Sequence, residues 1–514
     1  MSRSKRFVAS LVSSYAAIGV NILYTIASIP LALRYLDKQE FGLWALVMQL
    51  SGYLILLEFG MTGSVARSLS DHKDHIEDGN YGNVLRTGAR VFAIQGFLVA
   101  ILGLAVAWFG PSLLGIPERL QHTFTVLMAA QAIINGTKLG LGTLASPLWC
   151  HQRLDLSNLA SSISLVITFA VLWLGFHLGW KLYSLTVAAA VGSVCGLLFT
   201  YVSCRRLGYY PTRAHRGHFD SRLFRELFHF GSGLFMMNLG AQLASASQVI
   251  LCSRMLGMEA AAVWSISTKI FSLAQQFVGR VLDSSAGGLA EMAVRKESAT
   301  LQKRFHDIVS ISAVMAVIAS AGIALTNGPF IEIWTSGRIS WNPWNNLLLA
   351  MVLFSTAVTR SHTSLVGITK EIRGMKFVYL LEGLMFVTLS IILVPRIGIT
   401  GLLIAALACN IGITGTYGIR RTADYFGIAT HTVFAWCARP VGVLLLVVIL
   451  FAITRVSGLA GLDSTLRFVI GASLCAIIVI PSIWFFGMNP SLRREFSSLF
   501  DKIRLKAQAA LHMI

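Results

Sequence analysis

Arg34-Tyr-Leu-Asp-Lys-Gln-Glu-Phe-Gly-Leu-Trp44 is echoed by Arg254-Met-Leu-Gly-Met-Glu-Ala-Ala-Ala-Val-Trp264, which lies about 220 residues further along the chain. The Arg, Leu and Trp of the first stretch coincide with those of the second without a gap. Each stretch joins one long apolar segment to the next. A polytopic membrane protein built from two related halves is a transporter architecture, in which the substrate site lies between the halves. The number of membrane spans tests whether these matched residues mark such a repeat.

The composition requires contact with lipid. The chain has 514 residues, of which 55% are hydrophobic and only 13% are charged, and its mean hydropathy is +0.69. A soluble protein of this length cannot bury so much apolar surface, so we expect an all-α polytopic membrane protein. Segments near the ~20 residues needed to cross a bilayer core predict about fourteen transmembrane helices. The predicted spans are 8–33, 41–65, 87–109, 124–149, 157–178, 182–203, 231–252, 259–283, 306–326, 346–367, 377–395, 398–419, 440–457 and 466–487.

The net charge of +19 raises the question of nucleic-acid binding, but the distribution of the charge argues against it. If the amino terminus is cytoplasmic, most of the 42 Lys and Arg residues fall in the tails and the inner loops. This asymmetry is the positive-inside signal, and it predicts that both termini are cytoplasmic. We therefore expect membrane lipids, through their anionic headgroups, and not nucleic acid as partners of the basic surface.

The amino terminus does not predict a cleaved signal peptide. Met1-Ser-Arg-Ser-Lys-Arg6 resembles a signal-peptide n-region, but the apolar segment that follows runs to Leu33 and is too long for a typical h-region. We interpret it as an uncleaved first span.

No catalytic, metal or cofactor motif is visible. The seven cysteines have spacings that match no metal or redox motif and are interpreted as packing residues. There is no Gly-rich Lys-Ser/Thr phosphate loop, no His-Glu-x-x-His and no Gly-x-Ser-x-Gly. We predict that the chain is not an enzyme and uses no metal or cofactor.

The span order predicts five segments. Residues 1–203 form a lobe of six spans, 204–230 a basic cytoplasmic linker, 231–419 a second six-span lobe, 440–487 two further spans and 488–514 a basic amphipathic cytoplasmic tail. Because each lobe has an even number of spans, the two are expected to be parallel and pseudo-symmetric about an axis along the membrane normal. In the linker, Phe219, Leu223, Leu227 and Phe230 recur at helical spacing, which predicts an amphipathic helix on the inner leaflet.

Polar residues inside spans are the candidate functional residues, since such residues cost free energy in lipid and usually face a cavity or a partner. Within each span they are spaced by three or four and so share a helix face. We predict a cationic cavity suited to phosphate or pyrophosphate. Its candidate substrate-binding residues are Lys138, Lys269, Arg280, Gln131, Asn135, Gln276, Asn238 and Gln242.

A second group of candidates would carry charge coupling or gating: Glu58, Asp283, Arg67, Arg360 and Glu382. Any of the three acids could titrate in a step coupled to an H+ or Na+ gradient. The alternative is structural. Arg280 would pair with Asp283, Glu58 would pair with Arg67 or a lysine, and the arginines near the interface would extend to lipid headgroups.

Several motifs resemble a known family. Leu36 to Trp44, followed by Leu57-Glu-Phe-Gly-Met-Thr-Gly-Ser-Val-Ala-Arg67, resembles the start of the polysaccharide and O-antigen flippases. In that family the second span typically ends with an acid, a Gly and a later Arg, and Glu58, Gly60 and Arg67 match this pattern. The stretches 153–158 and 396–401 also resemble the family. The superfamily includes lipid II flippases and multidrug and toxin extruders.

The resemblance implies two six-helix lobes forming a V, two extra helices and alternating access. The implied cargo is a polyprenyl-pyrophosphate-linked oligosaccharide, moved from the inner to the outer leaflet of the bacterial inner membrane for O-antigen, capsule or exopolysaccharide. A glycan polymerase is an implied partner.

Four alternatives remain. A multidrug or cation antiporter is disfavoured because span 8–33 has no carboxylate, whereas a lipid II flippase would share the fourteen spans. A glycan polymerase or ligase would need a large exterior loop, which the chain lacks, and a non-transporting assembly scaffold is compatible with the sequence but unsupported by it.

Overall fold

Helices make up every regular element of the computed structural model, which describes residues 3–72, 76–77, 79–151, 153–369, 374–457, 459–489, 492–494 and 497. The predicted all-α fold is therefore confirmed. The chain divides into two compact units, unit 1 (Met1–Ser265) and unit 2 (Ile266–Ile514). This boundary falls later than the predicted start of a second lobe at residue 231, and the lobe assignment stays a prediction.

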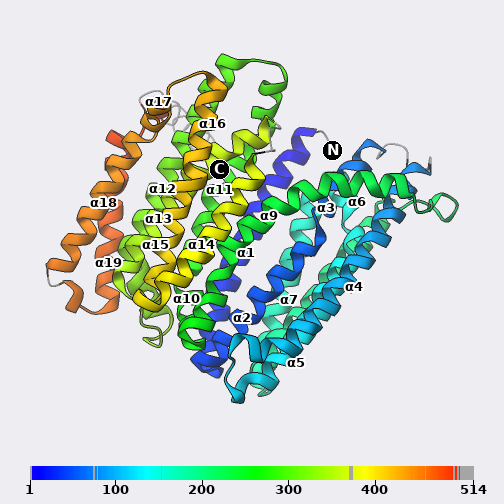
Figure 1. The fold of residues 1–514 in the computed structure, drawn as a ribbon, viewed down its shortest axis with the longest axis horizontal. Helices are drawn as coiled ribbons and strands as arrows, with labels where there is room; N and C mark the ends of the chain where they lie inside the picture. Colours follow the sequence, from blue (N-terminus) through cyan, green and yellow to red (C-terminus); the bar gives the residue numbers. More distant parts are fainter. Residues whose placement is uncertain are drawn as a thin grey trace, which may run out of the picture. The chain divides into compact units, whose positions relative to one another are not determined.

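Unit 1 is built from long helices that pack in pairs. α4 runs antiparallel to α5 (Figure 1), and α7 packs against α8. Its helices are α1 (Arg3–Tyr35), α2 (Lys38–Leu54), α3 (Met61–Asp71), α4 (Asn80–Leu114), α5 (Glu118–Gly140), α6 (Ser146–Cys150), α7 (Leu154–His177), α8 (Tyr183–Arg206), α9 (Ser221–Leu256) and α10 (Met258–Ser267), with the short turns η1 (Ile55–Glu58), η2 (Gly142–Leu144) and η3 (Arg213–His215).

Both copies of the repeated stretch form a helix–helix junction in unit 1. The first joins α1 to α2, where the Asp37 carboxylate accepts the Glu40 N–H at 2.7 Å and the Glu40 carboxylate accepts the Asp37 N–H at 2.9 Å. This reciprocal capping box starts α2. The second joins α9 to α10 through Gly257 at φ +92°. The copies touch: a Cβ added to Gly42 would lie 1.9 Å from the Met258 carbonyl oxygen, so only glycine allows this approach.

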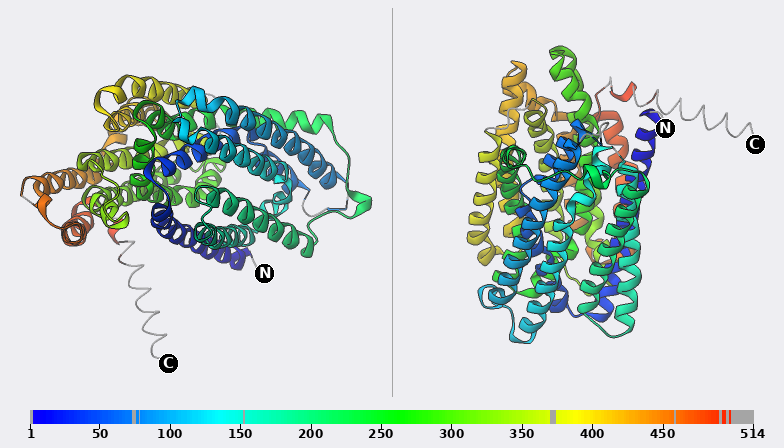
Figure 2. Two further views of the ribbon diagram at one scale, coloured as in Figure 1. Left: turned by 90° about the horizontal axis from the view of Figure 1, so that it is seen from below. Right: turned by 90° about the vertical axis from the view of Figure 1, so that its right-hand side faces the viewer.

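The basic linker is held against α4 (Figure 2). The Tyr81 hydroxyl donates to the Tyr209 carbonyl at 3.1 Å, and the His218 N–H donates to the Asn83 side chain at 2.8 Å. Also in the linker, the Thr212 hydroxyl donates to the Glu77 carboxylate, and this hydrogen bond holds the pKa of Glu77 below its ordinary value. These contacts hold the first part of the linker, before α9, against the protein.

The predicted amphipathic helix of the linker is the first part of α9, not a separate element. Asp220 caps α9 by accepting the N–H groups of Arg222 and Leu223, and the helix then continues without interruption to Leu256. Leu227 is buried in a cluster with Met61 of α3. Because α3 and α4 supply an apolar surface, part of the apolar face packs on protein instead of lying on the inner leaflet.

Unit 2 is arranged around α12, the most deeply buried of the long helices described. Figure 1 shows α18 and α19 beside each other at one edge of this unit. Its helices are α11 (Lys269–Val294), α12 (Ser298–Trp334), α13 (Pro343–Ile368), α14 (Met375–Ile397), α15 (Thr400–Cys409), α16 (Thr416–Phe426), α17 (Thr430–Ala435), α18 (Ala438–Val456), α19 (Ser464–Leu474) and α20 (Ile480–Ser482), with the 3-10 turn η5 (Leu459–Gly461) and the π-helical segments η4 (Asn410–Gly415), η6 (Cys475–Val479) and η7 (Ile483–Gly487).

Among the described residues, 11 helices are long and apolar enough to cross a membrane, or 12 if the bent pair of α5 with residues 142–150 counts as one span. Two predicted spans fall outside this set, 259–283 and 346–367. Both are helical, as α10–α11 and α13, but they are more polar than the rest. The count of fourteen stays a prediction. The predicted tail at 488–514 lies almost entirely outside the described residues.

Candidate functional site

The two helices that are too polar to pass as ordinary spans enclose a cavity in unit 2. α11 and α13 line a space of about 300 Å³, at the lower end of the range for small-molecule sites. Its walls are Ser272, Gln275, Gln276, Val278, Gly279, Leu282, Leu353, Thr356, Ala357 and Arg360. Their polar groups therefore face a shared space instead of lipid, which removes the cost of placing them in a membrane span.

An ion pair joins the two walls of this cavity. The Arg360 guanidinium donates from Nη2 to Asp283 Oδ1 at 2.9 Å, and both side chains are about half exposed. Asp283 thus pairs across to α13, and not with Arg280 of its own helix as the structural alternative supposed. Arg360 lines the cavity, whereas the sequence favoured an extension to lipid headgroups. Arg280 is exposed one residue beyond the wall residue Gly279, so this region carries two arginines and one carboxylate.

Gly279 makes the position of Arg360 possible. A Cβ added at this glycine would lie 2.6 Å from Arg360 Nη1, closer than a Cβ carbon approaches another heavy atom. On the same walls, Gln275 Nε2 donates to the Thr356 hydroxyl at 3.2 Å, while Gln276 is exposed in the cavity. Lys269 is the first residue of α11 and is half-buried, but it is not among the lining residues.

A second polar cavity of about 390 Å³ lies within unit 1 and brings together Glu58, Asn238 and Gln242. The Glu58 carboxylate accepts the Thr62 N–H at 3.0 Å instead of a cation. Gln242 is held in place through its backbone, because its carbonyl accepts the Tyr53 hydroxyl at 3.2 Å.

The chain turns sharply beside Glu58. Phe59 and Gly60 both have positive φ, at 50° and 68°, which is uncommon for a residue such as Phe59. The Phe59 ring packs on the Phe235 ring with centroids 4.4 Å apart, and both rings line the cavity. The conformation is therefore maintained by aromatic packing at the cavity wall.

The remaining candidates of unit 1 lie outside both of these cavities. On α5, Gln131 is buried and its Nε2 has no hydrogen-bond partner, Asn135 is half-buried and Lys138 is exposed. They share a helix face as predicted, but that face is not part of either cavity. Arg67 is exposed on α3.

Glu382 is the centre of a buried network in unit 2. On α14, its carboxylate accepts Asn410 Nδ2 at 3.2 Å and the Thr414 hydroxyl, both from the π-helical segment η4. Asn410 Oδ1 in turn accepts the Thr359 hydroxyl of α13 at 3.1 Å. The widened turn of a π-helix interrupts the regular backbone ladder and is often found at functional sites.

Thr359, Asn410 and Thr414 were not among the functional residues predicted from the sequence. The available signal was the i, i+4 spacing of Asn410 and Thr414, which places two polar groups on one face of an otherwise apolar span. Within the described part of the chain, no three His, Cys, Asp or Glu side chains are grouped so that they could hold a metal ion.

Residues 9–286 match the family described as Polysaccharide biosynthesis protein. The chain belongs to this family. A curated relative, the "Putative O-antigen transporter" of Shigella flexneri, is 20% identical over 403 residues, which is 76% of this chain and 91% of the relative.

Solved transporters of one superfamily share the fold of this polysaccharide biosynthesis family member. An inward-facing multidrug resistance MATE family transporter of the MOP superfamily has a TM-score of 0.69 at 14% identity, covering 78% of this chain and 94% of the transporter. The lipid II flippase MurJ, in an inward closed conformation, has a TM-score of 0.62 at 13% identity, covering 91% and 98%. The chain therefore shares its fold with these membrane transporters.

Proposed function

We propose that this family member is a flippase that moves a polyprenyl-pyrophosphate-linked oligosaccharide from the inner to the outer leaflet by alternating access. The observation that carries the proposal is the polar cavity between α11 and α13, whose wall includes Arg360. Arg360 pairs with Asp283, and the exposed Arg280 follows the wall residue Gly279. Guanidinium groups bind phosphate oxygens through paired N–H donors, so an excess of arginine suits a pyrophosphate. The O-antigen transporter name of the Shigella relative supports a glycan cargo.

The proposal gives the candidate residues different roles. Arg280, Arg360 and Lys269 would attract the pyrophosphate, with Asp283 holding Arg360 in place until the ligand arrives. Gln276 would donate to phosphate or sugar oxygens. In unit 1, Asn238 and Gln242 would contact sugar hydroxyls, and Lys138 would contribute a cation for acidic groups. Gln131, Asn135 and Arg67 would support these contacts.

The proposal also includes ion coupling, and Glu382 is its best-supported site. Charging a carboxylate among neutral partners in a membrane interior costs free energy. Proton binding or a small cation would remove that cost, so occupancy of Glu382 would respond to an H+ or Na+ gradient. Glu58 and Asp283 are weaker candidates, because backbone N–H donation and an arginine already stabilise their charges.

A flipping assay in proteoliposomes tests the function. Purified protein is reconstituted with a labelled polyprenyl-pyrophosphate oligosaccharide, and an impermeant reagent measures its exposure in the other leaflet. We expect protein-dependent exposure that is abolished by Lys269→Ala and by Lys138→Ala. The matched control is Lys303→Ala, which removes an exposed lysine at the start of α12 and should leave the rate unchanged.

A second pair of variants tests the arginine site without removing a charge. Gly279→Ala should displace the Arg360 guanidinium and lower flipping at least about tenfold, since it disturbs a charge-assisted contact. Gly322→Ala on α12 is the control, because its new Cβ meets nothing within 4 Å. Wild-type rates in the Lys138, Lys269 and Gly279 variants would refute the cationic site. Exposure of lipid II but not of the glycan lipid would assign a different cargo, and no exposure with either would reject the flippase.

A further inference from the structure

A separate polar recess lies in unit 2 where α12, α18 and α19 meet. Its volume is about 30 Å³, and its walls are Leu325, Pro329, Thr454, Arg455, Leu459, Arg467, Ile470 and Gly471. Since a single water needs roughly 10–15 Å³ of such space, the recess holds one or two oxygen-sized groups and not a whole ligand. A larger anion therefore fits only by projecting one or two of its oxygen atoms into the recess.

Two arginines and one carboxylate are gathered at the recess. Arg467 Nη2 donates to the Glu332 carboxylate and, at 3.1 Å, to the Ser464 hydroxyl, while that hydroxyl donates to Glu332. Arg455 has its guanidinium 5.1 Å from the centroid of the Phe451 ring. Glu332 balances only one of the two cations, so the recess carries an excess of positive charge.

The arginines have hydrogen-bonding capacity that their neighbours do not use. Nε of Arg455 and Nε of Arg467 are both buried without an acceptor. A buried N–H of a charged group without an acceptor is costly, and native proteins rarely leave one. Two such donors on adjacent cations suit an acceptor that carries negative charge and more than one oxygen.

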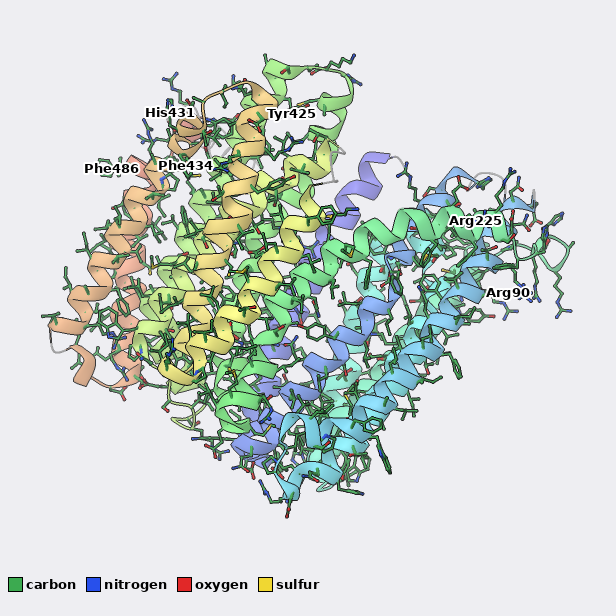
Figure 3. The ribbon with its side chains drawn as sticks, viewed as in Figure 1. Arg90, Arg225, Tyr425, His431, Phe434 and Phe486 are labelled. Carbon is green, nitrogen blue, oxygen red and sulfur yellow. The ribbon has the colours of Figure 1, made fainter. Side chains whose placement is uncertain are left out.

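Apolar residues next in sequence to the lining residues of α18 and α19 are exposed, and we call them the rim of the recess. Ile453, Val456, Leu466 and Val469 are all exposed, and Val456 is 87% exposed. α19, η6, α20 and η7 form one continuous helical segment, in which Arg467 is near the beginning and Phe486 near the end. The rim therefore lies at the end of this segment opposite to Phe486, which is labelled in Figure 3. An exposed apolar rim at the end of a membrane helix pair indicates contact with acyl chains.

We propose that this recess binds the phosphate of a membrane phospholipid, with the acyl chains lying on the apolar surface of α18 and α19. One phosphate oxygen would accept from Arg455 and another from Arg467, which supplies the missing acceptors. Gly471 contributes to the site by position: a Cβ there would lie 2.5 Å from the Leu325 carbonyl oxygen, so glycine lets α19 approach α12 and brings Arg467 to Glu332. The site is independent of the proposed transport function.

Lipid binding to the purified full-length protein tests the proposal. Native mass spectrometry in a neutral detergent would measure affinity for dioctanoyl phosphatidylglycerol, for dioctanoylglycerol, which lacks the phosphate, and for inorganic phosphate. We expect the phospholipid to bind at least about tenfold more tightly than the other two, the scale of a charge-assisted contact. Arg455→Gln should remove that difference. Arg338→Gln, which changes an exposed arginine shortly after α12, should preserve it.

Glu332→Gln separates ligand binding from structural support. It removes the carboxylate that pairs with Arg467, so it should tighten phospholipid binding several-fold, opposite in sign to Arg455→Gln. Equal weakening in both variants would mean that the cluster only supports the fold and would overturn the proposal. Equal affinity for the diacylglycerol would exclude phosphate recognition, and equal affinity for inorganic phosphate would exclude a lipid as the source.

Discussion

Glu382 could be identified from the sequence as a candidate residue, but its partners could not. The sequence marks it as one of few acids within the spans, but it does not show whether the acid has a charged partner. The structure places it against Asn410 and Thr414, which are neutral. Their i, i+4 spacing places both on one helix face, but their contact with Glu382 could not be predicted. The widened η4 turn brings both side chains to α14, and no simple sequence pattern specifies a π-helical segment.

Replacing Glu382 with glutamine tests coupling at this residue. Glu382→Gln keeps the side-chain length and one carbonyl acceptor while removing the titratable charge. We expect flipping in proteoliposomes to continue in the absence of a gradient, but to lose its acceleration by an imposed H+ or Na+ gradient. The measurement is the ratio of initial rates with and without each gradient.

Glu118→Gln serves as the control for that experiment, because it changes an exposed glutamate at the start of α5. It should retain the wild-type ratio. If Glu382→Gln also retains the ratio, coupling does not involve Glu382, and Glu58 and Asp283 become the acids to test.

At the scale of elements, long apolar helices were predictable and polar ones were not. The predicted spans 87–109 and 377–395 lie within α4 and α14, and the length and the hydropathy of both helices indicate a membrane span. Span 259–283 instead breaks between α10 and α11 around Thr268. The same polar residues that make α11 and α13 ambiguous as spans form the cavity wall, so the weakest span signals mark the candidate site.

The junction between the two copies of the repeated stretch gives an element-scale prediction. Gly42→Ala places a Cβ against a backbone oxygen of α10, which cannot move without shifting the helix. We expect destabilisation of about 1–3 kcal/mol, typical of overpacking, measured as a lower thermal unfolding midpoint in detergent. Gly19→Ala on α1 meets nothing within 4 Å and should be neutral or slightly stabilising, because alanine favours a helix over glycine. Equal midpoints for the two variants would contradict the close approach.

At the scale of the whole molecule, hydropathy and motif resemblance predicted the transporter fold, whereas the grouping of candidate residues needed the structure. Gln276, Arg360 and Asp283 come together, as do Glu58, Asn238 and Gln242. Helix periodicity assigns residues to a face, but which face meets which depends on packing between helices distant in sequence. Lys138 shows the limit: its place on a polar face was predicted, but that face lines neither cavity.

Orientation in the membrane is a property of the whole chain, and the charge distribution predicts it. The linker 204–230 is rich in arginine, and Arg225 and, on α4, Arg90 are exposed near it (Figure 3). The loop between α12 and α13 has few basic residues. The positive-inside rule therefore predicts that the linker is cytoplasmic and that the α12–α13 loop is exterior. Single cysteines introduced by Ala214→Cys and Ser340→Cys, both at exposed positions, would be labelled with an impermeant maleimide. We expect Ser340→Cys to react in intact cells and Ala214→Cys only after permeabilisation, with the unsubstituted protein as the background. The reverse labelling pattern would contradict the predicted orientation, and the Arg455–Arg467 recess would then lie at the cytoplasmic leaflet.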